Sequence, residues 1–180
     1  MTVTAGTTPL SPRRWIEALV VALAVAAGVL ARNGVDGWGV VEALAAGTLV
    51  WLAAIDLETR LLPNWIVVPG TVALLVACGV FDSSSLVEHV VAAVVAGGLF
   101  LVAAILRPAD LGMGDVKLVF FLGALLGAGV LNALAIGFGL VALYALVLIV
   151  RQGRSALKRH LPLGPFLAAG AILVLIITPG

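Results

Sequence analysis

The chain consists of apolar stretches, each long enough to cross a membrane, that alternate with short polar breaks. It is 63% hydrophobic and 11% charged, whereas a soluble globular domain is roughly 45–50% apolar and about 25% charged. About 20 apolar residues span the hydrocarbon core as an α-helix, because lipid offers the backbone no hydrogen-bond partner. The sequence therefore predicts an all-α, polytopic transmembrane helix bundle.

About seven helices are expected from these stretches. The apolar stretch that follows Asp115 and runs to Val150 is too long for one crossing of a core about 30 Å thick at 1.5 Å per residue. We therefore divide it near residues 127–132. Residues 1–12 are predicted to be a disordered tail, and residues 13–180 form the transmembrane domain. The predicted helices cover residues 15–31, 38–55, 65–80, 86–106, the two halves of 115–150, and 163–177.

The basic residues predict how the bundle is oriented, because Lys and Arg concentrate in cytoplasmic loops of membrane proteins. If Arg13 and Arg14 are cytoplasmic and seven helices alternate, only Arg32 of the ten Lys and Arg residues falls outside. The N-terminus is therefore predicted to be cytoplasmic. Two arginines before an apolar run also fit a secretory or twin-arginine signal, but the further apolar stretches favour a retained helix.

Two aspartates at helix ends form the candidate site. Asp56 ends the second predicted helix and Asp115 begins the fifth, and the predicted orientation places both on the cytoplasmic side. A charge beside a membrane helix is costly and indicates a functional site by default. The helix dipole favours the ionised form at Asp115 and disfavours it at Asp56. If the two carboxyl groups lie close together they share one proton, which is how an aspartic protease activates water.

Each aspartate also has a simpler interpretation. Asp115 follows a glycine turn and could serve only as a helix N-cap, while Asp56 could be an interfacial carboxylate near Arg60. A small transporter or channel that uses the two carboxylates as proton or cation ligands is a further alternative. It would place them near the membrane midplane, whereas both lie at helix ends here. A non-catalytic assembly subunit would not need both aspartates.

The residues around Asp115 suggest that another chain approaches it. Gly112 and Gly114 permit positive φ angles and the close approach of a second backbone. Lys117 lies about 200° around the helix from Asp115, so we expect its ammonium group to reach the lipid headgroups.

Three motifs, in this order, resemble those of type IV prepilin peptidases. The first begins at Asp56 and closes with Leu62-Pro63-Asn64. The second is Gly112-Met113-Gly114-Asp115-Val116-Lys117-Leu118. The third, Pro162-Leu163-Gly164-Pro165-Phe166-Leu167, resembles the usual Pro-Phe-Gly-Pro-Phe-Leu and departs from it at Leu163. Presenilin-like proteases share Gly-x-Gly-Asp but carry a Tyr-Asp pair on the preceding helix, where this chain has Ile55 before Asp56.

The resemblance implies an intramembrane aspartic endopeptidase of the inner membrane in which Asp56 and Asp115 are catalytic. Its substrate would be a type IV prepilin or pseudopilin, cut at the basic leader on the cytoplasmic face. Many members also methylate the new N-terminus through a domain with paired Cys-x-x-Cys motifs. This sequence has one cysteine, so the resemblance implies the short, peptidase-only form found with tight-adherence and competence pili. Lipid and pilus or secretion assembly proteins are the other implied partners.

The motifs contain further residues whose roles we expect to be structural. Gly164 lies between Pro162 and Pro165, and we expect this segment to fix a turn that packs the last helix near the site. Glu58 and Asp110 could bind the basic leader, but we expect both to be solvated.

The remaining polar residues indicate no second site. His89 and His160 lack metal-ligand spacing, and the single Cys78 is expected to pack as a small hydrophobic residue. Glu42 and Glu88 are expected at the membrane interface. No cofactor or metal is predicted, and charges spread over short loops do not form a nucleic-acid-binding patch.

Overall fold

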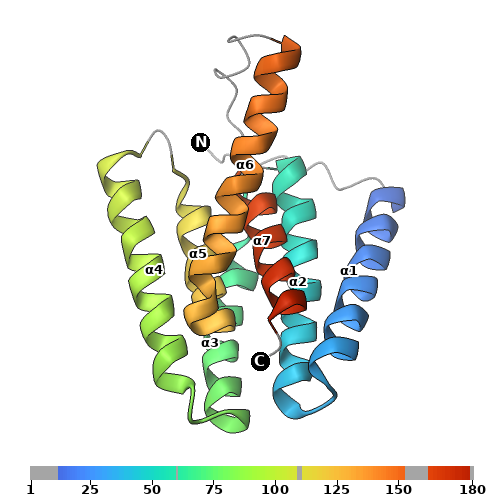
Figure 1. Cartoon of the computed structure of the whole chain (residues 1–180), viewed down its shortest axis with the longest axis vertical. Helices are drawn as coiled ribbons and strands as arrows, with labels where there is room; N and C mark the ends of the chain where they lie inside the picture. Colours follow the sequence, from blue (N-terminus) through green and yellow to red (C-terminus); the bar gives the residue numbers. More distant parts are fainter. Residues whose placement is uncertain (1–11, 60, 109–110, 153–161, 179–180) are drawn as a thin grey trace, which may run out of the picture.

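The computed structural model describes residues 12–59, 61–108, 111–152 and 162–178, and these form an all-helical bundle (Figure 1). Five segments are long and apolar enough to cross a membrane, and α5, η1 and α6 together make one of them. The all-α, multi-pass prediction is therefore confirmed. The elements are α1 Pro12–Asn33, α2 Gly37–Thr59, α3 Asn64–Phe81, α4 Leu86–Leu106, α5 Met113–Leu126, the 3₁₀ turn η1 Gly127–Gly129, α6 Val130–Gln152 and α7 Gly164–Ile177.

The predicted division of residues 115–150 is confirmed, and its cause is local. Gly127 ends α5 with a φ of +52°, a left-handed conformation that favours glycine. The following residue, Ala128, gives its backbone N–H to Glu88 Oε1 of α4 at 2.9 Å. The chain therefore reverses at η1, and α6 runs back in the opposite direction to α5 (Figure 1).

Most helices pack against a helix that is next to them in the sequence, and contacts of α7 and α5 connect these pairs to one another. α1 lies along α2, α4 along α5, and α6 along α7, while α7 also contacts α2 and α5 contacts α3. In lipid, association depends on close van der Waals packing, which small residues allow. At Gly123 of α5, an added Cβ would lie 2.5 Å from the Cα of Ala93 in α4. α4 and α5 therefore meet almost backbone to backbone.

This packing gives the bundle two distinct ends. The end of α2 and the starts of α1, α3, α5 and α7 lie at one end, which we call the Asp56 end (Figure 1). The α1–α2 and α3–α4 connections, η1 and the end of α7 lie at the other, which we call the Glu42 end. Residues 1–11 of the predicted tail lie outside the described residues, and α1 already begins at Pro12.

Candidate active site

Asp56 lies inside the bundle, near the C-terminal end of α2. Only 6% of the residue is exposed. In the last turn of α2, the backbone carbonyl of Ile55 accepts a hydrogen bond from the side chain of Thr59, whose Oγ1 lies 2.9 Å away. Asp56 packs against the first residue of α7, Gly164, where an added Cβ would lie 2.6 Å from Asp56 Oδ2. Glycine at position 164 therefore allows the start of α7 to lie against the carboxylate.

Asp115 comes from the first turn of α5 and is half-buried. Gly112 precedes the helix with extended backbone, φ −76° and ψ 144°, and its carbonyl accepts the N–H of Asp115 at 3.1 Å. In this position the carboxylate lies near the positive end of the helix dipole. The expected use of positive φ angles at the glycines is not found: among the described glycines only Gly34 and Gly127 have positive φ.

Gly114 is required for space instead. An added Cβ at this position would lie 3.3 Å from Leu62 Cβ, so the α2–α3 connection lies directly on the first turn of α5. Pro63 holds that connection with φ −70° and ψ 115°, and its carbonyl accepts the N–H of Ile66 at 3.0 Å. The first motif thus packs on the second.

The two aspartates are brought together although they come from different helices. The charge of Asp56 acts on Asp115 across the site. α7 packs on both α2 and α5, so three helix ends converge around the carboxyl groups. Two carboxyl groups within electrostatic reach in a site of low polarity cannot both ionise readily. The arrangement can hold a single proton and position a water between an acid and a base.

Lys117 does not extend to lipid headgroups as expected. Its Nζ donates a hydrogen bond to Asn64 Oδ1 at 2.7 Å. This bond links the first motif to the second and ties the start of α3 to the start of α5. The separation of the two residues along the chain explains why the sequence did not predict the bond.

The third motif also reaches this end of the bundle. Pro165 lies in the first turn of α7, where proline is tolerated because its missing N–H has no helical partner. Pro162 lies in the segment just before the helix. Of the other predicted residues, Arg60 and Asp110 lie outside the described residues.

Glu58, expected to be solvated, is ion-paired instead. Arg14 Nη1 of α1 lies 2.9 Å from Glu58 Oε1, and the Glu58 side chain is only 19% exposed. The two residues are 44 positions apart. No sequence motif marks this pair, which sequence reasoning therefore missed.

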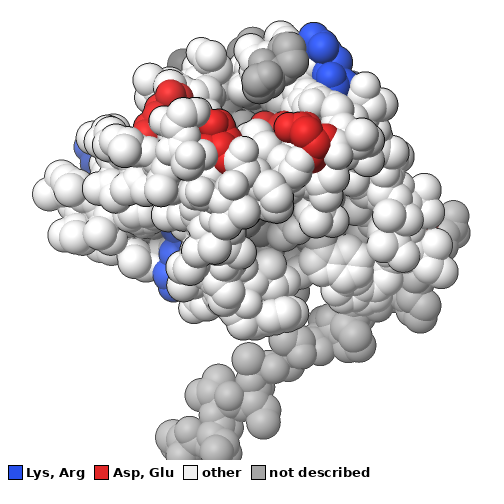
Figure 2. Space-filling view, turned by 90° about the horizontal axis from the view of Figure 1, so that it is seen from below, with Lys and Arg blue, Asp and Glu red and all other residues white. Residues whose placement is uncertain are grey.

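The Glu42 end has a separate polar cavity of about 320 Å³. Acidic side chains gather around a hollow on this face (Figure 2). Glu42 and His89 line the cavity together with Asp82 and Glu88. Glu42, expected at the membrane interface, is 5% exposed and accepts a hydrogen bond from Asn33 Nδ2. Within the described parts of the chain, no group of three His, Cys, Asp or Glu side chains could hold a metal ion.

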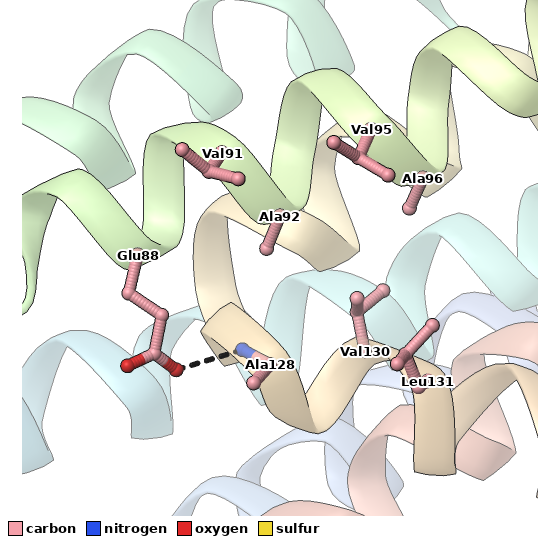
Figure 3. A pocket seen from close by; sticks show the side chains of 8 residues that line it. All are labelled: Glu88, Val91, Ala92, Val95, Ala96, Ala128, Val130 and Leu131. Atoms are coloured by element: carbon pink, nitrogen blue, oxygen red, sulfur yellow. Dashed lines mark hydrogen bonds between the residues drawn. The ribbon is translucent and has the colours of Figure 1, made fainter.

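An apolar groove of about 230 Å³ lies on the bundle surface between α4 and the start of α6. Its walls are valine, alanine and leucine side chains, and the bond between Glu88 and Ala128 lies at one end (Figure 3). Neither Asp56 nor Asp115 lines it. The only polar side chain that lines the groove, Glu88, already accepts the backbone N–H of Ala128, so the aspartate pair remains the candidate active site.

Comparison with known proteins agrees with the motifs. A family model described as the type IV leader peptidase family matches residues 43–178. The prepilin leader peptidase/N-methyltransferase of Burkholderia pseudomallei is 31% identical over 158 residues, covering 84% of this chain and 51% of the relative. The protein of that name from Dickeya chrysanthemi is 34% identical over 160 residues, covering 84% and 54%.

The chain spans about half the length of these curated relatives, and no solved structure matches it. The matched region nevertheless includes all three motifs and the helix ends that meet at the two aspartates. The resemblance stated from the motifs is thus confirmed, and the chain belongs to the type IV leader peptidase family.

Proposed function

We propose that the chain is an intramembrane aspartic endopeptidase that removes the basic leader of type IV prepilins or pseudopilins. The observation that carries this proposal is the approach of Asp56 and Asp115 from α2 and α5, within electrostatic reach of each other. Family membership supports the substrate class, because the relatives are named prepilin leader peptidases.

In the proposed reaction the two carboxyl groups hold one proton between them. The ionised carboxylate takes a proton from water, and the oxygen of that water bonds to the scissile carbonyl carbon. The other carboxyl group gives its proton to the carbonyl oxygen. The intermediate then collapses: the C–N bond breaks, the leaving nitrogen takes a proton from the first aspartate, and one hydroxyl of the intermediate returns its proton to the second aspartate, which restores the starting pair.

The location of the pair suits a substrate that enters from the aqueous side. Asp56 and Asp115 lie at helix ends, whereas a proton- or cation-coupled transporter would have such groups near the midplane. Gly112 is exposed and has no Cβ, which leaves room for a peptide backbone beside Asp115. We therefore favour a peptidase over a transporter.

The distribution of basic residues supports placing this end at the cytoplasmic face of the inner membrane. Arg14, Arg107, Lys117 and Arg151 lie at the Asp56 end, and Arg32 lies at the last turn of α1 at the other end. This asymmetry follows the positive-inside rule. The single cysteine of the sequence provides no paired Cys-x-x-Cys motif, so we assign the leader peptidase step alone to these helices.

Co-expression with a candidate prepilin tests the proposal. Wild type is expected to shorten the prepilin at its N-terminus, as measured by mass spectrometry. Asp56→Asn and Asp115→Asn should each leave it at full length while still inserting in the membrane. Asp82→Asn is the matched control, because Asp82 lies at the Glu42 end. Normal processing by either active-site variant would show that the pair is not catalytic.

A further inference from the structure

The ion pair between Arg14 and Glu58 lies beside the proposed active site. Glu58 is two residues after Asp56, near the end of α2, and Arg14 reaches it from the first turns of α1. The Nη1–Oε1 distance is 2.9 Å. This pair joins an acidic group near the proposed catalytic aspartates to a basic residue in the first turn of an apolar helix.

The two side chains of this ion pair differ in how deeply they are buried. The Glu58 side chain is 19% exposed and the Arg14 side chain is 67% exposed. The carboxylate is thus largely enclosed by the bundle, whereas the guanidinium group approaches from the aqueous side on a flexible side chain. Exposed ion pairs contribute little net stability, so another cation can replace Arg14 at small cost.

Arg14 also keeps an anionic neighbour when it leaves Glu58. Glu17, one turn further along α1, interacts electrostatically with Arg14. The start of α1 has a second attachment to α2, since the rings of Trp15 and Trp51 lie 4.4 Å apart. Release of the Arg14 head group therefore requires no movement of α1.

The geometry fixes how far a cation on Glu58 would lie from the cleaved bond. Residues two apart on a helix point about 200° apart, so Glu58 faces α1 while Asp56 faces α7. A helix with its side chains is about 10 Å across, and an extended peptide advances about 3.3 Å per residue. A peptide crossing the end of α2 would place its basic residue about three residues from the bond at Asp56.

We propose that Glu58 is the specificity-determining carboxylate that binds a basic residue of the substrate leader, and that Arg14 occupies it when no substrate is bound. This inference rests on the proposed function, since it assumes a leader peptide cut at Asp56 and Asp115. A similar order of residues occurs in α1 itself, where Arg13-Arg14 lies in the first turn and directly precedes Trp15 and the apolar part of the helix. The Arg14–Glu58 contact supplies the geometry that the proposal assigns to a basic residue of the leader.

The test uses the full-length protein in detergent and synthetic prepilin peptides with a single lysine before an apolar helix. The lysine is placed one to six residues before the cleaved bond. Wild type should give its lowest KM with the lysine about three residues away. Glu58→Gln should raise that KM about tenfold, the cost of a charge-assisted contact, with little change in kcat.

Arg14→Gln is the matched control, because it breaks the same ion pair and leaves Glu58 in place. We expect it to lower KM, since the competing guanidinium group is gone. A structural role for the pair predicts instead that both variants change KM in the same direction by a similar factor, and that result would overturn the proposal. An unchanged KM in Glu58→Gln would overturn it as well.

Charge exchange adds a readout that does not depend on stability. Glu58→Lys should cleave the lysine peptide poorly and regain cleavage when that lysine is replaced by glutamate. Absence of this rescue in a variant that remains monodisperse and cleaves a neutral peptide would contradict direct binding. If wild type cleaves no prepilin peptide, the proposed function fails; if it cleaves without regard to Glu58, only this inference fails.

Discussion

Two acidic residues, one near each end of α2, are buried to the same degree but are held in different ways. Asp56 is 6% exposed and Glu42 is 5% exposed. Glu42 accepts a hydrogen bond from the side-chain amide of Asn33 at 2.6 Å, so a neutral donor satisfies it. Each residue also has an acid within electrostatic reach, Asp36 for Glu42 and Asp115 for Asp56, but only Asp56 and Asp115 both belong to the family motifs. Burial and a nearby acid therefore do not by themselves distinguish the carboxyl group proposed to be catalytic from a structural one.

The polar groups near Glu42 are held by hydrogen bonds to neutral partners. The cavity beside Glu42 also contains His89, whose Nδ1 donates to the carbonyl of Ala124 at 2.9 Å. In the α3–α4 connection, hydrogen bonds from Ser85 and Ser84 hold the pKa of Asp82 below its ordinary value. These groups are fixed by neutral partners. At the Asp56 end, Gly164 and Gly114 instead allow the start of α7 and the α2–α3 connection to pack closely around the two aspartates.

The largest expected effect is the loss of activity when either aspartate of the proposed catalytic pair is replaced. Asp56→Asn and Asp115→Asn should each lower kcat by about 10³-fold or more, because each removes one half of an acid–base pair. The double variant should be hardly worse than either single variant, since the two residues act as a unit. Rates of prepilin cleavage measure both. Additive losses would indicate that the two aspartates act independently.

Gly164→Ala should have the next largest effect. The new Cβ would lie 2.6 Å from Asp56 Oδ2, so the carboxylate or the start of α7 must move. A displacement of about 1 Å at a reacting group can cost about 100-fold in rate, and we expect that loss in kcat with KM little changed. Gly98→Ala is the control, because nothing lies within 4 Å of its added Cβ. Equal activity of the two variants would argue against this contact.

Glu42 should affect stability rather than catalysis. Glu42→Ala leaves the Asn33 amide without its acceptor, and burying an unsatisfied polar group costs about 1–3 kcal/mol. Glu42→Gln retains an acceptor oxygen and should recover most of that loss. Unfolding in detergent measures the stability, and cleavage per folded molecule should stay near wild type in both variants. Loss of cleavage in folded Glu42→Gln would remove the distinction between the two ends.

The smallest effect is expected at the bond between Lys117 and Asn64. A double-mutant cycle with Lys117→Met and Asn64→Ala should give a coupling energy of about 0.5–1 kcal/mol, because the bond is exposed to solvent. The measurement is the free energy of unfolding of the four proteins. A coupling of zero would show that the bond does not hold α3 to α5.

The helices could be predicted from the sequence because the bilayer imposes their length. Apolar stretches must form helices in lipid, and Gly127 lies inside the predicted break and ends α5 there. The motifs identified Asp56 and Asp115 as the candidate pair, and the family they resemble is confirmed. The burial of Glu42 could not be predicted, because the sequence position of an acid near a helix end is equally compatible with a buried side chain and with one at the membrane interface.

The contacts between helices were decided only by the tertiary structure. In a membrane bundle the faces toward lipid and toward the core are both apolar, so the sequence does not show how each helix is rotated. That rotation pairs Arg14 with Glu58 and Lys117 with Asn64, and it brings Gly164 against Asp56. The sequence by itself determined an all-helical membrane protein with two aspartates at helix ends, because hydrophobicity and length suffice for that. The surroundings of those aspartates depend on packing across helices.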